Sequence, residues 1–151
     1  MYKRQIPPII GWTSVTPEIS LLPLSMFVII FFWTPPHFWA LSVYRFNDYA
    51  KAKVPMLPNV SSIDETKKQI IYYSVILIAS SYLPYIDRGV GLIYFVIATI
   101  LNFFLLNNAI KLKKSKEKKS IPNTEGLKFF ALTIFYLFSL FAGLLIDHVI
   151  M

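Results

Sequence analysis

The chain has no cysteine among its 151 residues, and only 8 of them are acidic. The missing thiols exclude disulfides, thiolate metal ligands and a cysteine nucleophile. Charged residues make up 15 % of the chain, whereas hydrophobic residues make up 56 %, including 13 phenylalanines. This composition is far from that of an ordinary soluble domain. Any chemistry must therefore use oxygen and nitrogen groups, and lipid is the expected solvent.

Four apolar runs are long enough to cross a bilayer, which needs about 20 helical residues. Helices satisfy their own backbone hydrogen bonds in lipid, so we predict an all-α polytopic membrane helix bundle forming a single membrane domain over residues 1–151. The run Ile6–Trp12 is much shorter and contains two prolines, which indicates that residues 1–18 are the remnant of a preceding helix and its loop. No signal peptide is recognisable. The four predicted spans are about 19–44, 68–85, 90–110 and 127–148.

Basic residues are concentrated in two of the connections between these spans, 45–67 and 111–126, and beside them. Together they hold 12 of the 15 lysines and arginines, and two spans separate them, so they lie on one side of the membrane. The positive-inside rule makes that side the cytoplasm, or the matrix of an organelle. The asymmetry also explains the net charge of +7, so no nucleic-acid partner is predicted. The basic residues concerned are Arg45, Lys51, Lys53, Lys67, Lys68, Lys111, Lys113, Lys114, Lys116, Lys118, Lys119 and Lys128.

The end of the first span combines a proline pair, Pro35 and Pro36, with a histidine, His37. The prolines remove two backbone donors, which predicts a kink and unpaired carbonyls one turn earlier. A helical step of 100° predicts one stripe leading from the middle of the membrane to its surface. The stripe comprises Trp33, His37, Tyr44 and Asp48.

Two interpretations of this stripe remain open. In the structural one, His37 bonds the carbonyls freed by the prolines, the aromatic residues form an interfacial belt, and Arg45 and Asp48 are solvated charges. In the functional one, an ionisable group at membrane depth is costly enough to indicate a site. The polar stretch that follows favours the second interpretation. Asp48 and Asn47 offer oxygen ligands suited to Mg²⁺, while Arg45, Lys51 and Lys53 suit phosphate oxygens.

Three stretches, Pro7–Trp12, Phe32–Leu41 and Asp48–Pro58, closely resemble the protohaem IX farnesyltransferase (haem O synthase) family of UbiA-type intramembrane prenyltransferases. The blocks W-T-P-P-H-F-W-A-L and D-Y-x-x-A-x-x-P-M-L-P are long and specific. The resemblance implies the C-terminal part of a nine-helix bundle. It also implies transfer of a farnesyl group from farnesyl diphosphate to a vinyl group of haem b, giving haem O, with haem as substrate and Mg²⁺ as cofactor.

The resemblance further implies roles for individual residues. Asp48 and Arg45 become the catalytic pair, with Asp48 holding Mg²⁺ or its water shell. Asn47 would assist the metal, while Lys51 and Lys53 would contact diphosphate. His37 would meet the haem iron or a propionate. The remaining substrate contacts fall to Trp33, Tyr44 and Tyr49.

Two departures from the family pattern stand out. The first acidic motif of the superfamily has no counterpart, and Ala52 replaces the second carboxylate that other branches carry four residues after Asp48. We therefore expect this chain to be the C-terminal half of the enzyme and to need the missing N-terminal half for activity. Its expected home is a bacterial inner membrane, or alternatively a mitochondrial one, with haem A synthase as a candidate partner. The alternatives are a quinone-precursor prenyltransferase, an inactive fragment and a non-enzymatic membrane subunit.

Overall fold

The computed structural model describes residues 6–16, 20–86, 90–115 and 123–150. This part of the chain is helical and contains no strand, which confirms the predicted all-α polytopic bundle. Lys116, Lys118 and Lys119 of the predicted basic loop, and the start of the first predicted span, lie outside the described residues. The helices are α1 (Pro7–Thr13), α2 (Leu21–Tyr44), α3 (Phe46–Lys51), α4 (Leu57–Val60), α5 (Ile63–Ser80), α6 (Leu83–Ile86), α7 (Leu92–Lys114) and α8 (Thr124–Ile150).

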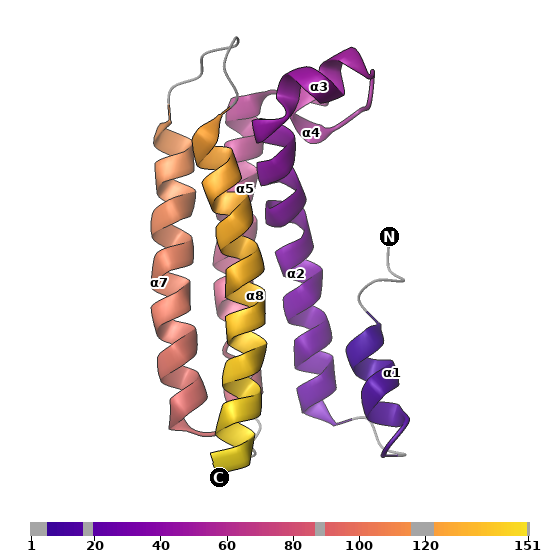
Figure 1. The fold of residues 1–151 in the computed structure, drawn as a ribbon, viewed down its shortest axis with the longest axis vertical. Helices are drawn as coiled ribbons and strands as arrows, with labels where there is room; N and C mark the ends of the chain where they lie inside the picture. The colour runs from indigo at the N-terminus through magenta and orange to yellow at the C-terminus, as the bar shows by residue number, and fades with distance from the viewer. Residues whose placement is uncertain (1–5, 17–19, 87–89, 116–122, 151) are drawn as a thin grey trace.

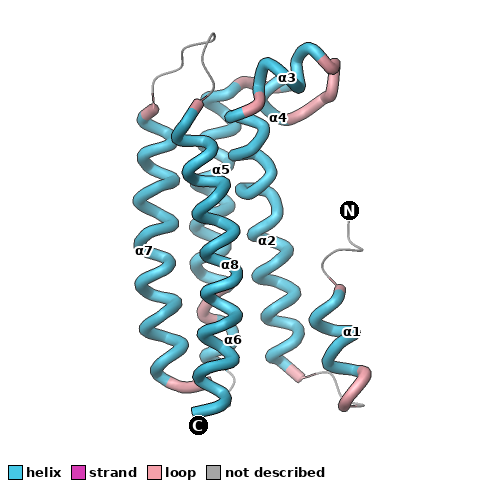
Figure 2. Tube along the Cα trace, in the orientation of Figure 1, coloured by secondary structure: helices cyan, strands magenta, loops and turns pink. Residues whose placement is uncertain are grey.

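The four long helices α2, α5, α7 and α8 stand side by side, and each packs against two of the others (Figure 1). The segments Leu21–Tyr44, Ile63–Ile86, Leu92–Lys114 and Thr124–Ile150 are long and apolar enough to cross a membrane. The short helices α3 and α4 form a lobe at one end of the bundle, and α6 lies toward the other end (Figure 2). Both predicted basic connections begin at the end that carries the lobe.

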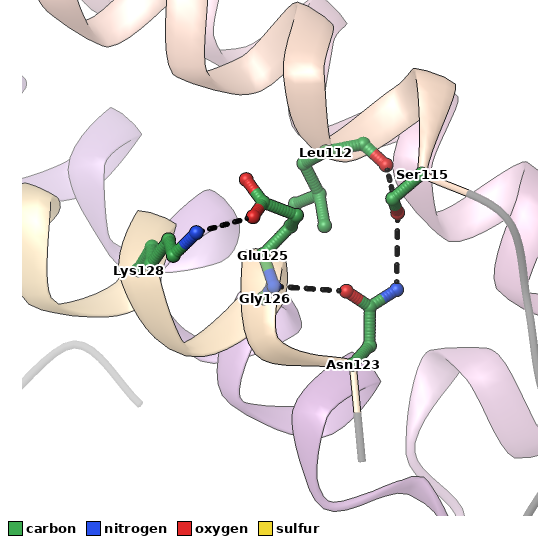
Figure 3. A network of polar contacts seen from close by, with 6 residues as sticks. All are labelled: Leu112, Ser115, Asn123, Glu125, Gly126 and Lys128. Carbon is green, nitrogen blue, oxygen red and sulfur yellow. Dashed lines mark hydrogen bonds and ion pairs between the residues drawn. The ribbon is translucent and has the colours of Figure 1, made fainter. Parts of the chain in front are cut away.

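Polar caps explain where two of the long helices, α5 and α8, begin. Helix α5 starts at Ile63, before the predicted Lys68, because Ser62 Oγ accepts the backbone N–H of Glu65 at 3.1 Å. Helix α8 starts after Asn123, whose side-chain oxygen accepts the N–H groups of Glu125 and Gly126 at 3.1 and 3.2 Å. The Asn123 amide also donates to Ser115 Oγ at 3.1 Å, which ties the end of α7 to the start of α8 (Figure 3).

Buried charged side chains from other helices bind both ends of α7. At its N-terminus the Asp147 carboxylate of α8 accepts the backbone N–H of Gly91 and, at 3.2 Å, that of Tyr94. At its C-terminus Lys67 Nζ of α5 donates to the Ser115 carbonyl at 3.0 Å. Asp147 and Lys67 are each only 1 % exposed. An anion at the start of a helix and a cation at its end both complement the helix dipole.

We expect Lys67→Met to destabilise the bundle by about 2 kcal/mol, because a charge-assisted bond to the end of α7 is lost. Lys68→Met is the matched control, because Lys68 is the next residue and its side chain is 61 % exposed in a surface pair with Glu65. That change should stay within about 0.5 kcal/mol. Unfolding of the two variants in mixed micelles measures the difference, and equal losses would contradict a specific role for Lys67.

A second interior polar cluster joins α7 and α8 to the turn after α5. Tyr136 Oη donates to Asn102 Oδ1 at 2.8 Å, and Asn102 Nδ2 donates to Ser81 Oγ at 2.9 Å. Tyr94 Oη completes the cluster by donating to the Ser81 carbonyl at 2.6 Å. Polar bonds of this kind hold membrane helices together where apolar burial gives no driving force. The cluster is therefore a structural clamp.

Candidate functional site

The proline pair lies inside α2, which continues through Pro35 and Pro36 to Tyr44. Such prolines are tolerated where neighbouring helices enclose the affected backbone. Pro36 and His37 are buried, and α5 and α8 both pack on α2. The structural interpretation proposed that His37 bonds carbonyls of its own helix, but no such bond is present among the described residues. Its hydrogen bond goes across the bundle to α8.

His37 is held between two aromatic rings. Trp33 stacks on one face with ring centroids 4.2 Å apart, and Phe130 of α8 stacks on the other at 4.4 Å. Trp33 Nε1 donates to the backbone carbonyl of Thr133 at 2.7 Å, which fixes the indole against α8. The His37 side chain is consequently 7 % exposed and has a set orientation.

The hydrogen bonds of Thr133 determine which ring nitrogen of His37 carries the proton. Thr133 Oγ1 donates its only proton to the Phe130 carbonyl at 2.7 Å. The 2.8 Å contact between His37 Nδ1 and Thr133 Oγ1 therefore needs a proton on Nδ1. In the neutral ring this leaves a lone pair on Nε2, for which the described residues provide no partner. Nε2 can accept a proton, a hydrogen bond or a bond to a metal.

The helix ends at Tyr44 because Arg45 leaves the helical conformation, with φ −97° and ψ 30°. Helix α3 then turns away from the axis of α2 (Figure 1). The prediction that Asp48 continues the stripe of Trp33, His37 and Tyr44 is therefore wrong, because that stripe assumed one unbroken helix. Asp48 instead belongs to the lobe. His37 lies inside the bundle, seven residues and about 10 Å before the end of α2 at Tyr44.

The two faces of α3 separate the predicted polar residues. Asn47, Asp48 and Lys51 are exposed and share the outward face of the helix. Arg45 pairs with Asp48 at 3.9 Å, and their side chains are 58 % and 69 % exposed. An exposed pair of this kind contributes at most about 1 kcal/mol, so a ligand can readily replace either partner. These four groups form the outward polar face.

The other face of α3 borders a shallow pocket of about 400 Å³ between α3 and α4. Tyr49 and Lys53 lie here, on the side of the lobe away from Asp48. Asn59 donates from Nδ2 to the Val54 carbonyl at 3.1 Å, while its Oδ1 is buried without a partner among the described residues. The pocket is lined by Phe46, Tyr49, Ala50, Lys53, Val54, Pro55, Asn59 and Val60.

Lys53 has a structural constraint that the motif does not reveal. Its φ is 52°, in the left-handed region that favours glycine. Val54 N donates to the Tyr49 carbonyl at 3.1 Å and Lys53 N to the Ala50 carbonyl at 3.2 Å, the two bonds of a Schellman C-cap. Lys53 thus ends α3 through its backbone, whatever its ammonium group binds.

We expect Lys53→Gly to stabilise the lobe by about 1 kcal/mol, because glycine has no penalty in the left-handed region. Ala52→Gly is the matched control, since Ala52 has φ −78° and gains nothing from the same freedom. Hydrogen exchange of the backbone amides at positions 53 and 54 should slow about fivefold in Lys53→Gly and speed up in Ala52→Gly. Faster exchange in Lys53→Gly would contradict the idea that the positive φ of Lys53 is strained.

No three carboxylate, imidazole or thiol groups within the described ranges lie close enough to hold a metal ion. Asp48 is the sole carboxylate of the outward polar face, since Asp64 belongs to the first turn of α5. Mg²⁺ is commonly held by one or two carboxylates together with substrate phosphates and water. The outward polar face fits that role with one carboxylate and two adjacent cations, but it could not hold the metal without the ligand.

Sequence reasoning missed Thr133 and Phe130, although both contact His37. They lie on α8, and Thr133 is 96 residues after His37 in the sequence. The residues around them form an ordinary apolar span, so nothing in their local sequence indicates a contact with His37. Asn59 was also missed, although it directly follows the recognised P-M-L-P block. Only the packing of α2 on α8 and of α4 on α3 brings these residues to their sites.

The bundle and its polar end define an integral membrane protein of the helical, multi-spanning class. The UbiA prenyltransferase family matches residues 4–134, and the chain belongs to that family. No solved structure matches the chain.

Relatives named protoheme IX farnesyltransferase are similar over almost the whole chain. The Coxiella burnetii protein is 46 % identical over 142 residues, which are 94 % of this chain and 45 % of the relative. The Idiomarina loihiensis protein is 47 % identical over 142 residues, covering 94 % and 46 % of the two chains. The Pelagibacter ubique protein is 43 % identical over 145 residues, covering 96 % and 48 %. The chain thus spans slightly less than half the length of these relatives.

Proposed function

We propose that this chain is the C-terminal half of a protohaem IX farnesyltransferase and works together with the N-terminal half of the fold. The similarity to proteins of that name, at up to 47 % identity, is the observation that carries the proposal. The substrates are farnesyl diphosphate and haem b, and the product is haem O. The proposed home is a bacterial inner membrane, with residues 45–67 and 111–126 on the cytoplasmic side. Haem A synthase, which would use the product, is a proposed partner.

In the proposed reaction the bond between the farnesyl carbon and the diphosphate oxygen breaks, and diphosphate leaves with the bonding electrons. The allylic cation adds to the haem vinyl group, and water then adds to the resulting cation and loses a proton. Prenyltransferases of this family generally use divalent metal ions. A bound Mg²⁺ would neutralise charge on the leaving diphosphate. Asp48, assisted by Asn47, would hold the metal, while Arg45 and Lys51 would contact phosphate oxygens.

The haem side of the proposal rests on His37. Its Nε2 lone pair, fixed in direction by the Trp33 and Phe130 rings and by Thr133, suits the haem iron. A haem propionate would instead be bound after Nε2 takes up a proton, because a carboxylate only accepts hydrogen bonds. Trp33 and Tyr44 would form the aromatic wall of the apolar substrate cavity. Tyr49 and Lys53 would contact the substrate at the pocket between α3 and α4. Aromatic ring faces can also stabilise an allylic cation.

His37→Gln tests the haem contact, because glutamine retains a donor for Thr133 but has no imidazole lone pair. We expect haem b to bind the assembled enzyme at least tenfold more weakly, with a changed Soret spectrum. Thr133→Val serves as the control: it removes the bond that selects the Nδ1–H form but leaves the imidazole between the Trp33 and Phe130 rings, so haem binding should weaken less and the iron ligation spectrum should remain. An unchanged spectrum in His37→Gln would remove His37 from the haem site.

Co-expression of the chain with the N-terminal half of the Coxiella burnetii relative tests the whole proposal. Membranes holding both halves should convert haem b and farnesyl diphosphate to haem O, detected by mass spectrometry. Neither half alone should do so. Haem O formed by this chain alone would contradict the need for a second half. Prenylation of an aromatic acid with haem b untouched would replace the haem assignment.

A further inference from the structure

The exposed face of α7 changes from apolar to basic along the helix axis. Its middle carries large apolar side chains that no described element covers: Phe103 is 67 % exposed and Phe104 is 53 % exposed. Lys111 and Lys114 are exposed near the C-terminal end of the same helix. Asn107 lies between the two groups. At 100° per residue, one face carries Val96, Ile100, Phe103, Phe104, Asn107, Lys111 and Lys114.

The polar groups on this face have no partners among the described residues. Lys68 and Lys128 pair with Glu65 and Glu125 at 3.1 and 2.6 Å, whereas no carboxylate of the described chain pairs with Lys111 or Lys114. The half-buried Asn107 amide also makes no hydrogen bond to a described residue, unlike Asn108, whose amide donates to the Phe104 carbonyl at 2.9 Å. A half-buried amide next to two cations that no described carboxylate pairs with is suited to a ligand that carries both an anion and polar ester groups.

We propose that this face of α7 binds an anionic phospholipid. The acyl chains would lie along Phe103, Phe104 and Ile100, the ester and glycerol oxygens would meet Asn107, and the phosphate would lie between Lys111 and Lys114. The Lys111 position is about 6 Å further along the helix axis than Asn107, which matches the order of ester and phosphate groups in a phospholipid. Basic residues at a membrane surface attract anionic lipids. This site is independent of farnesyl transfer.

Spin-labelled lipids test the proposal on the full chain reconstituted in phosphatidylcholine vesicles. The fraction of label immobilised by the protein gives the relative association of spin-labelled phosphatidylglycerol and phosphatidylcholine. We expect a clear preference for phosphatidylglycerol, falling about fivefold for each lysine removed in Lys111→Gln and Lys114→Gln. The matched control is Lys113→Gln, because Lys113 is exposed on a different side of the same helical turn and should leave the preference unchanged.

Asn107→Leu separates the ester contact from the charge contact. Both lipids carry the same esters, so this change should weaken both associations by a similar factor and leave their ratio unaltered. Millimolar inorganic phosphate should not displace the labelled lipid, since it lacks the acyl chains. The site is refuted if the wild-type chain shows no preference, if Lys113→Gln loses as much preference as Lys111→Gln or Lys114→Gln, or if phosphate displaces the lipid.

Discussion

Asp48→Asn is expected to lower farnesyl transfer by the assembled enzyme by about 10²- to 10³-fold, the usual effect of removing one group that stabilises developing charge. Asp48 is the sole carboxylate on the outward polar face, so no other described residue of that face can replace it in the proposed contact to the metal. Asparagine preserves the size of the side chain and one oxygen but removes the charge. The loss should therefore appear in the rate rather than in the folding of α3.

The matched control for this prediction is Asp64→Asn. Asp64 is also exposed at the lobe end of the bundle, but it lies in the first turn of α5 and not on α3. The rate of farnesyl transfer by Asp64→Asn should stay within about twofold of the wild-type rate. A Mg²⁺ titration adds a second measurement: Asp48→Asn should need a higher Mg²⁺ concentration for half-maximal rate, and Asp64→Asn should not. Equal activity of the Asp48 variant and the wild type would remove Asp48 from the site.

The architecture could be predicted from the sequence because each span is a long apolar run, and length alone fixes such helices. The direction of α3 could not be predicted. It depends on one residue, Arg45, whose ψ of 30° leaves the helix although its sequence neighbours are ordinary helix formers. That single departure separates Asp48 from the stripe of His37, so the predicted site divides into a buried histidine cluster and an exposed polar face.

Residue type and spacing likewise identified His37 but not its partners. Trp33 is one helical turn from His37, so periodicity could place them together. Thr133 and Phe130 reach His37 only through the packing of α8 on α2, where Gly126 allows a close approach. A Cβ at Gly126 would lie 3.0 Å from the Ala40 carbonyl oxygen. Such contacts between distant segments leave no local pattern in one sequence.

The second large effect is expected at the opposite end of the bundle, where Asp147→Ala should destabilise the chain by about 3 kcal/mol. The buried carboxylate accepts the N–H groups of Gly91 and Tyr94 at the start of α7. Bonds to a charged acceptor contribute about 1.5 to 3 kcal/mol each, and the helix dipole adds to them. Asp147 is 1 % exposed, so alanine leaves both N–H donors buried and without an acceptor. The cost of removing these donors from water is then no longer offset by hydrogen bonds.

His148→Ala is the matched control, because His148 is the next residue on α8 and is exposed. Unfolding in mixed micelles should show a loss for Asp147→Ala and almost none for His148→Ala. Asp147→Asn should fall between them, since its single amide oxygen can still accept one of the two N–H groups. Hydrogen exchange locates the effect: the amides of Gly91 and Tyr94 should exchange faster, while those of Lys53 and Val54 keep their rates. Faster exchange at both ends of the bundle would indicate a general loss of packing instead of a lost cap on α7.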